Sequence, residues 1–387
     1  MSSTIGTSTD VGATRTTHQR NIIYAVGLFW AFYSDGVSFV YRTSTDGIAW
    51  SVATAIIAVS TLGYNQSIAF DGVYVHYAFG SGVITITYRR GLLVSDGTIT
   101  WSAASQTAIS DVNYWYYTPT IAVDSSGYAY IGTVRGDVTT GANRIPIVLK
   151  NANNNGTWSM AAGYPVTLNA TTDANWRTNV VALTRNHMVA VYAYSASVVR
   201  VKRLVGGSTW GTERTSTTNV ESGFSISATA VLPVYESIMQ LRGRGGEKLS
   251  KTEFMKFAER DNVDIVFLED VNYDINLIRY KYESDSLGTE ITLEDVAQSS
   301  TSFPVIGRDN LRNKTYVFWA NGDHIYYIAG SRKGWGAKVD WIDETADDLA
   351  SNITLQCFLM RYSNYMGVIY TAKTVSPYDV RFNTLTL

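Results

Sequence analysis

The chain is poor in cysteine, proline and charge. Its 387 residues include one cysteine and 6 prolines, and only 17% of them are charged. A single cysteine excludes a disulfide framework and a cysteine-based zinc site. The net charge is −2 and no block of basic residues is present, so the electrostatic footprint of a nucleic-acid-binding protein is missing. No apolar run reaches the roughly 18 residues of a membrane-spanning helix.

Other functional signals are also missing. The polar N-terminal stretch lacks the basic-then-apolar order of a signal peptide. The four histidines fall in separate parts of the sequence, which is not the pattern of a metal cluster. We therefore expect no metal and no cofactor.

Aromatic residues are abundant, at 13% of the chain, and this composition excludes intrinsic disorder. Short stretches rich in Val, Ile, Tyr, Phe and Thr alternate between apolar and polar positions and are separated by Gly, Asp, Asn and Ser. This pattern predicts many short β-strands joined by tight turns. The expected class is all-β.

A repeat of about 50 residues organises these strands. Successive units end in a glycine-containing turn followed by tryptophan, at Trp50, Trp101, Trp158, Trp210 and Trp335. Four short strands per repeat of this length is the unit of a β-propeller. Seven first strands are expected, starting near Ile23, Ile68, Ile121, Val180, Ala228, Ile306 and Phe358.

The predicted fold is therefore a single seven-bladed β-propeller domain over residues 1–387, with a six-bladed ring as the alternative. The last unit has only three strands, so the N-terminal stretch is expected to supply its fourth and close the ring. Each repeat tryptophan is expected to have a structural role at the flank of its blade.

One segment, residues 235–260 in blade five, differs in character. It is densely charged and has helical apolar spacing, which predicts a helical hairpin inserted between two strands. It weakly resembles a degenerate EF-hand, but Arg242, Arg244 and Gly246 stand where calcium-binding carboxylates belong. The hairpin is a candidate docking element for a protein partner.

Two turns carry a family resemblance. Ser44, Asp46, Gly47 and Trp50, and then Ser95, Asp96, Gly97 and Trp101, are similar to the Asp-box of sialidase-type propellers, with altered spacing. The resemblance implies the propeller scaffold. The activity would also need an arginine triad and a Tyr/Glu pair. Arg15 and Arg20 are candidates for the first arginine and Arg177 for the second, and the sequence reveals neither the third arginine nor the Tyr/Glu pair. Catalytic residues therefore stay unassigned.

Ligands of propellers usually bind over the central channel, at the face where the loops preceding the first strands open. The residues that shortly precede each first strand lie at this face, and a series of them are aromatic. Aromatic faces beside Arg and Asn suit a sugar. The predicted ligand-binding residues are Arg20, Tyr64, Asn65, Trp115, Tyr117, Trp176, Arg177 and Phe224.

These features favour a non-enzymatic recognition or structural propeller that binds a glycan or surface ligand. Low charge and many Tyr, Thr, Asn and Ser residues are typical of adhesive proteins on a virion or cell exterior, and a virion protein needs no signal peptide. Two alternatives are a sialidase-like glycoside hydrolase and an engineered propeller carrying a grafted hairpin.

Overall fold

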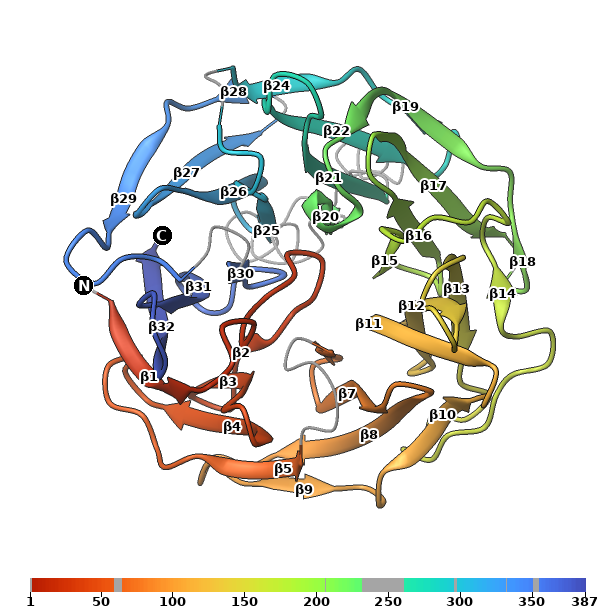
Figure 1. Cartoon of the computed structure of the whole chain (residues 1–387), viewed down its shortest axis with the longest axis horizontal. Coiled ribbons are helices and arrows are strands. Elements are labelled where there is room, and N and C mark those ends of the chain that lie inside the picture. Colours follow the sequence, from red (N-terminus) through yellow and green to blue (C-terminus); the bar gives the residue numbers. More distant parts are fainter. Residues whose placement is uncertain are drawn as a thin grey trace, which may run out of the picture.

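The computed structural model describes residues 2–58, 65–205, 207–231, 261–295, 298–331, 333–350 and 355–387. Seven antiparallel sheets surround a central channel, as Figure 1 shows in a view down that channel. The predicted seven-bladed propeller is confirmed, and the six-bladed alternative is wrong. The described residues contain no α-helix, only a short 3-10 turn at η1 (Gly223–Ser225).

The innermost strand of each blade begins within three residues of its predicted start or contains it. These strands are β2 (Ile22–Ala25), β6 (Gln66–Phe70), β11 (Tyr114–Val123), β15 (Arg177–Ala182), β20 (Ser227–Val231), β25 (Val305–Asp309) and β30 (Gln356–Cys357). The second strands are β3 (Leu28–Ser34), β7 (Tyr74–Gly82), β12 (Ala129–Asp137), β16 (Met188–Ala193), β21 (Asn262–Leu268), β26 (Lys314–Asn321) and β31 (Tyr365–Ala372).

The third strands are β4 (Ser38–Ser44), β8 (Thr85–Leu93), β13 (Ile145–Lys150), β17 (Ser197–Val205), β22 (Ile275–Lys281), β27 (His324–Ser331) and β32 (Tyr378–Thr386). The outer strands are β5 (Thr54–Ala58), β10 (Gln106–Ser110), β14 (Val166–Thr167), β19 (Arg214–Val220), β24 (Ile291–Glu294), β29 (Val339–Asp343) and β1 (Ser3–Ser8). Short additional strands are β9 (Ile99–Trp101), β18 (Thr209–Trp210), β23 (Ser286–Leu287) and β28 (Gly334–Trp335).

The apolar core lies between the blades. Each cluster of buried hydrophobic side chains draws on two neighbouring blades, such as Val191 of β16 with Ile265 of β21, or Phe32 of β3 with Tyr77 of β7. A blade is thus covered on both faces. Strands β3 and β21 are accordingly buried at every position, which explains why they read as nearly continuous apolar runs.

The first strand of the chain closes the ring, as predicted. β1 pairs antiparallel with β32, so that Ser3 lies opposite Phe382. The Ser3 hydroxyl donates to the Gly47 carbonyl at 2.6 Å and accepts from the Trp50 indole at 3.2 Å. The turn that ends blade one therefore also holds the closing strand of blade seven, next to it in Figure 1.

The repeat tryptophans occupy equivalent half-buried positions. Trp101, Trp210 and Trp335 each pair with the third strand of their blade, and Trp50 and Trp158 pack against clusters between blades. The turn before Trp50 is held by the Asp46 carboxylate, which accepts from the Ile48 and Ala49 amides at 2.8 and 2.9 Å. Gly47 in this turn has φ +73°, a conformation that favours glycine.

The predicted hairpin at residues 235–260 lies outside the described residues. The strands on either side of it, β20 and β21, pair directly, with Val231 opposite Asn262. The inserted segment thus joins two adjacent strands of blade five without interrupting the sheet.

Candidate functional site

We call the end of the channel where the inner strands begin the upper face, and the end where they finish the lower face. Of the predicted ligand-binding residues, Tyr64 lies outside the described residues. Four others have less than a tenth of their surface exposed: Arg20, Asn65, Trp176 and Arg177. The remaining three, Trp115, Tyr117 and Phe224, are half-buried.

The four buried residues hold protein partners. The Trp176 indole donates to the Thr171 carbonyl at 2.9 Å, and its ring packs against Tyr192 and Tyr194. Asn65 accepts through Oδ1 from the Thr118 amide at 2.7 Å. The Asn65 contact connects blades two and three, and the Trp176 ring packs within blade four.

Residues 12–21, here called the channel segment, cross the ring between β1 and β2. Figure 1 shows this stretch of chain, in red, reaching the centre of the molecule and returning to β2. All its residues are buried except Arg15, which is half-buried. Its side chains bond to several blades: Gln19 donates to the Pro119 carbonyl at 3.0 Å, and Thr17 donates to the Phe224 carbonyl at 2.7 Å.

Arg20 is the deepest charged group of this segment. Its guanidinium donates to five oxygens at 3.0–3.2 Å, namely the carbonyls of Thr17, Gln19, Ala228 and Ile306 and the hydroxyl of Ser227. Arg20 therefore ties blades five and six to the channel segment. The sequence carried no signal for this role, because only the tertiary fold brings residues so distant along the chain together.

Trp115 and Tyr117 form an aromatic pair at the start of β11, with ring centroids 6.0 Å apart and an interplanar angle of 71°. The guanidinium of Arg144 lies 4.0 Å from the Tyr117 centroid. Arg144 is itself fixed, since its Nε donates to the Gly141 carbonyl at 2.7 Å and its Nη1 to the Ala174 carbonyl at 2.7 Å. The upper face thus carries a preformed, partly exposed aromatic–arginine pair on blade three.

Phe224 provides a second such site on blade five. The Arg177 guanidinium lies 3.3 Å and that of Arg15 5.4 Å from the ring centroid. The Ser222 hydroxyl accepts from the Phe224 amide and caps η1, which sets the position of the ring. The structure therefore brings Phe224 together with two of the three arginines considered for the sialidase triad.

Glu221, three residues before Phe224 in the sequence, is a further candidate residue that the sequence analysis missed. Burial and then the negative charge of Asp270 raise its pKa to about 7, from the usual value of 4.5. Its Oε2 atom is buried and forms no hydrogen bond with the described residues. A carboxyl group with this pKa exchanges its proton near neutral pH. Only the fold places Asp270, from the loop after β21, beside it.

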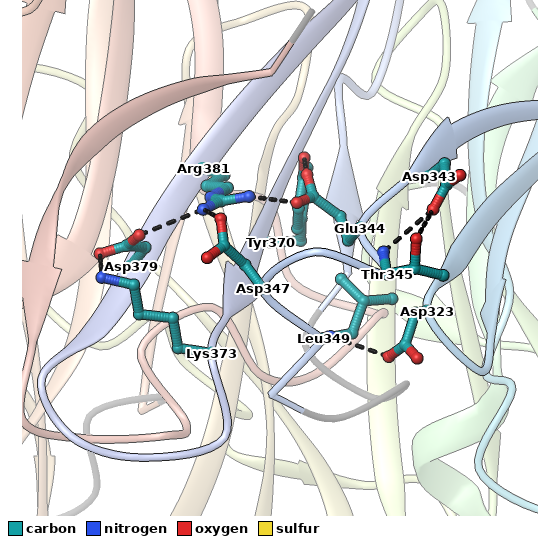
Figure 2. Close-up of polar contacts among 10 residues, drawn as sticks. All are labelled: Asp323, Asp343, Glu344, Thr345, Asp347, Leu349, Tyr370, Lys373, Asp379 and Arg381. Atoms are coloured by element: carbon teal, nitrogen blue, oxygen red, sulfur yellow. Dashed lines mark hydrogen bonds and ion pairs between the residues drawn. The ribbon is translucent and has the colours of Figure 1, made fainter.

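A charged network joins blades six and seven at the upper face (Figure 2). The Arg381 guanidinium binds Glu344 and Asp347, and also Asp379 at 3.2 Å. Tyr370 donates to Glu344 at 2.5 Å. Arg381 and Glu344 are both buried, so the network anchors the connection that leads from β29 towards β30 and does not present a free arginine.

The described residues contain no group of three or more His, Cys, Asp and Glu side chains placed to hold a metal ion. Within these same ranges, no helix is long and apolar enough to cross a membrane.

No protein-family model matches the chain, and no curated protein matches it. Solved structures do resemble it. The BP39L lectin from Burkholderia pseudomallei has a TM-score of 0.67 at 11% identity, covering 97% of this chain and 96% of the lectin. The Hadza microbial sialidase Hz136 has a TM-score of 0.53 at 12% identity, covering 100% of this chain and 68% of the sialidase.

A further similar structure is AofleA from Arthrobotrys oligospora, with a TM-score of 0.52 at 10% identity and coverage of 85% of this chain and 88% of AofleA. Identities this low show a common fold and nothing finer. The chain is a seven-bladed β-propeller, and its fold resembles the folds of a lectin and a sialidase.

Proposed function

We propose that this protein is a carbohydrate-binding propeller that recognises glycans on its upper face and acts on the exterior of a virion or cell. The observation that carries the proposal is the pair of partly exposed aromatic sites there, Trp115 with Tyr117 and, on blade five, Phe224, each with an arginine against a ring. The shared propeller fold with a lectin supports it.

The chemistry of these sites suits a sugar. A pyranose presents an apolar face of C–H groups, which packs on an aromatic ring, and hydroxyl groups at its edge, which need directional partners. Arg144 is held rigidly beside Tyr117 by two backbone carbonyls. A preformed site of this kind loses little conformational freedom on binding. Of the predicted residues with described positions, we therefore assign ligand contact to Trp115, Tyr117 and Phe224.

A glycan array with the intact protein tests the proposal, followed by titration of each positive glycan. Replacing Trp115 with Ala is expected to weaken binding at least tenfold, because a stacking ring is lost. Trp101→Ala is the matched control. Trp101 is also half-buried with an arginine, Arg89, 4.1 Å from its ring centroid, but it lies on β9 at the flank of blade two.

The control should lower stability and leave the affinity unchanged. If no glycan on the array binds, or if Trp115→Ala and Trp101→Ala affect binding equally, the upper-face site is wrong.

A second function, glycoside hydrolysis, is favoured by one observation, the raised pKa of Glu221 beside Asp270. A glycosidase needs one carboxyl group that holds its proton near neutral pH and a second carboxylate close by. A panel of fluorogenic glycosides tests this activity. Turnover that is lost in Glu221→Gln and has a pH profile with a limb near 7 would support hydrolysis, and an inactive wild-type protein would exclude it for the glycosides tested.

A further inference from the structure

The central channel contains a second candidate site, at the opposite end from the proposed glycan face. A cavity of about 240 Å³ lies beneath the channel segment. Its walls come from the later residues of β6, β11, β15 and β20, and it extends to Asp71, Asp124 and Asn310, which follow inner strands. The cavity therefore reaches the lower face, and the channel segment forms its deep end.

Three buried polar side chains line this cavity, and two of them have hydrogen-bond donors to spare. His18, Arg20 and Asn179 are 1%, 7% and 5% exposed. Nε of Arg20 and Nδ2 of Asn179 form no hydrogen bond with the described residues, whereas the His18 ring interacts with the Thr118 backbone. A buried donor without a partner costs about 1–3 kcal/mol, so two of them around one cavity require an explanation.

The charge at the deep end is uncompensated. The partners of the Arg20 guanidinium are four carbonyls and one hydroxyl, and within the described ranges no carboxylate forms an ion pair with it. Burial, followed by the positive charges of Arg177 and Arg20, lowers the pKa of His18 well below 6.5, although a hydrogen bond to the Thr118 backbone opposes the shift. The imidazole is therefore neutral at pH 7 and adds no charge to that of Arg20.

The two acidic residues on the cavity wall already have partners. Asp71 lies 3.0 Å from Nε2 of His76, and Asp124 accepts from the amides of Ser126 and Tyr128 at 3.0 Å each. They do not neutralise Arg20. The remaining wall is largely apolar and includes Ile121, Val181 and Leu359.

We propose that this cavity binds a small organic carboxylate, with Arg20 and Asn179 at the carboxylate group. A carboxylate offers acceptors to these two unsatisfied donors and places a negative charge beside the buried guanidinium. Its hydrocarbon part lies against the apolar wall. The site is independent of the proposed glycan site, because it lies at the other end of the channel.

Isothermal titration calorimetry with sodium butyrate tests this site, with butyramide as the neutral analogue and sodium chloride as the ionic control. We expect saturable binding of butyrate alone. Asn179→Leu removes a donor at similar volume and should weaken binding about tenfold or more. Ala69→Leu fills part of the cavity from a partly exposed wall position and should abolish binding.

Asn272→Leu, at an exposed position in the loop after β21, is the matched control and should bind butyrate as the wild type does. Thermal melting of each variant establishes that it is folded, and if Asn179→Leu does not fold, Ala69→Leu decides the question. The proposal is overturned if the wild type shows no binding up to about 50 mM butyrate, if butyramide binds equally well, or if Ala69→Leu retains wild-type affinity.

Discussion

Glycine and tryptophan are matched across strands within the blades. Gly330 of β27 lies opposite Trp335, and Gly91 of β8 lies opposite Trp101. A Cβ atom on Gly330 would come within 2.2 Å of the Trp335 ring, and one on Gly91 within 2.9 Å of the Trp101 ring. The glycine thus supplies the space in which the indole lies flat on the third strand.

Gly330→Ala is therefore expected to destabilise the protein by about 1–3 kcal/mol, because the added methyl displaces a rigid ring. Urea denaturation measures the change. Gly288→Ala is the matched control, because the nearest atom to its added Cβ would be the Arg279 carbonyl oxygen, at an ordinary contact distance of 3.4 Å. Equal effects of the two substitutions would contradict the proposed glycine–tryptophan contact.

Glu221 makes stability depend on pH. Its pKa is about 7 in the folded protein and near 4.5 when exposed. Between these values the folded state keeps a proton that the unfolded state has lost, so the free energy of unfolding falls as pH rises from about 4.5 to 7. In Glu221→Gln this contribution disappears, so between pH 5 and 7.5 the melting temperature of the variant should fall less than that of the wild type.

The exposed Glu283→Gln substitution serves as the comparison and should preserve the wild-type slope. An unchanged slope in Glu221→Gln would show that this carboxyl group titrates normally.

At the scale of the elements, Arg381 determines how β32 meets the connection from blade six. Because it binds Glu344, Asp347 and Asp379 (Figure 2), removing its charge leaves the buried Glu344 carboxylate without a cation, with only the Tyr370 hydroxyl as partner. We expect Arg381→Met to cost about 3–5 kcal/mol, the usual range for breaking a buried pair.

Lys373→Met removes a cation from the same network, but this side chain is 40% exposed where it meets Asp379. Its loss should cost less than about 1 kcal/mol. Chemical denaturation of both variants measures the two losses of stability. A small effect of Arg381→Met would mean that the network contributes little to the free energy of unfolding.

The strands were predictable because each blade repeats its own local signals. Alternating Val, Ile and Tyr between turn residues identified all seven inner strands, from Ile23 to Phe358, and the tryptophan spacing ordered them. The positions of Arg20, Trp176 and Arg177 were harder to infer. The position of a residue before a strand predicts the face of the ring on which it lies. Whether its side chain points to solvent depends on the channel segment and on neighbouring blades.

The ring as a whole depends on one strand pairing. β1 contributes the fourth strand of blade seven through its register with β32. Deleting residues 2–8 exposes the edge of β32 and removes the Ser3 contacts with Gly47 and Trp50. Differential scanning calorimetry should show a melting temperature lowered by several degrees.

Residues 12–21 remain in this deletion variant, so the change tests the closing strand and not the channel segment. Melting at the wild-type temperature would show that β1 is dispensable for ring stability.

The pairing of β1 with β32 has a consequence for biosynthesis. Ser3 and Phe382 are separated by 379 residues, so β1 has no partner until β32 has emerged from the ribosome. A nascent chain can form blades one to six in order, but it must keep β1 unpaired throughout. Residues 12–21 follow this strand and bond to blades five and six, so the centre of the ring reaches its final arrangement only after those blades have been made.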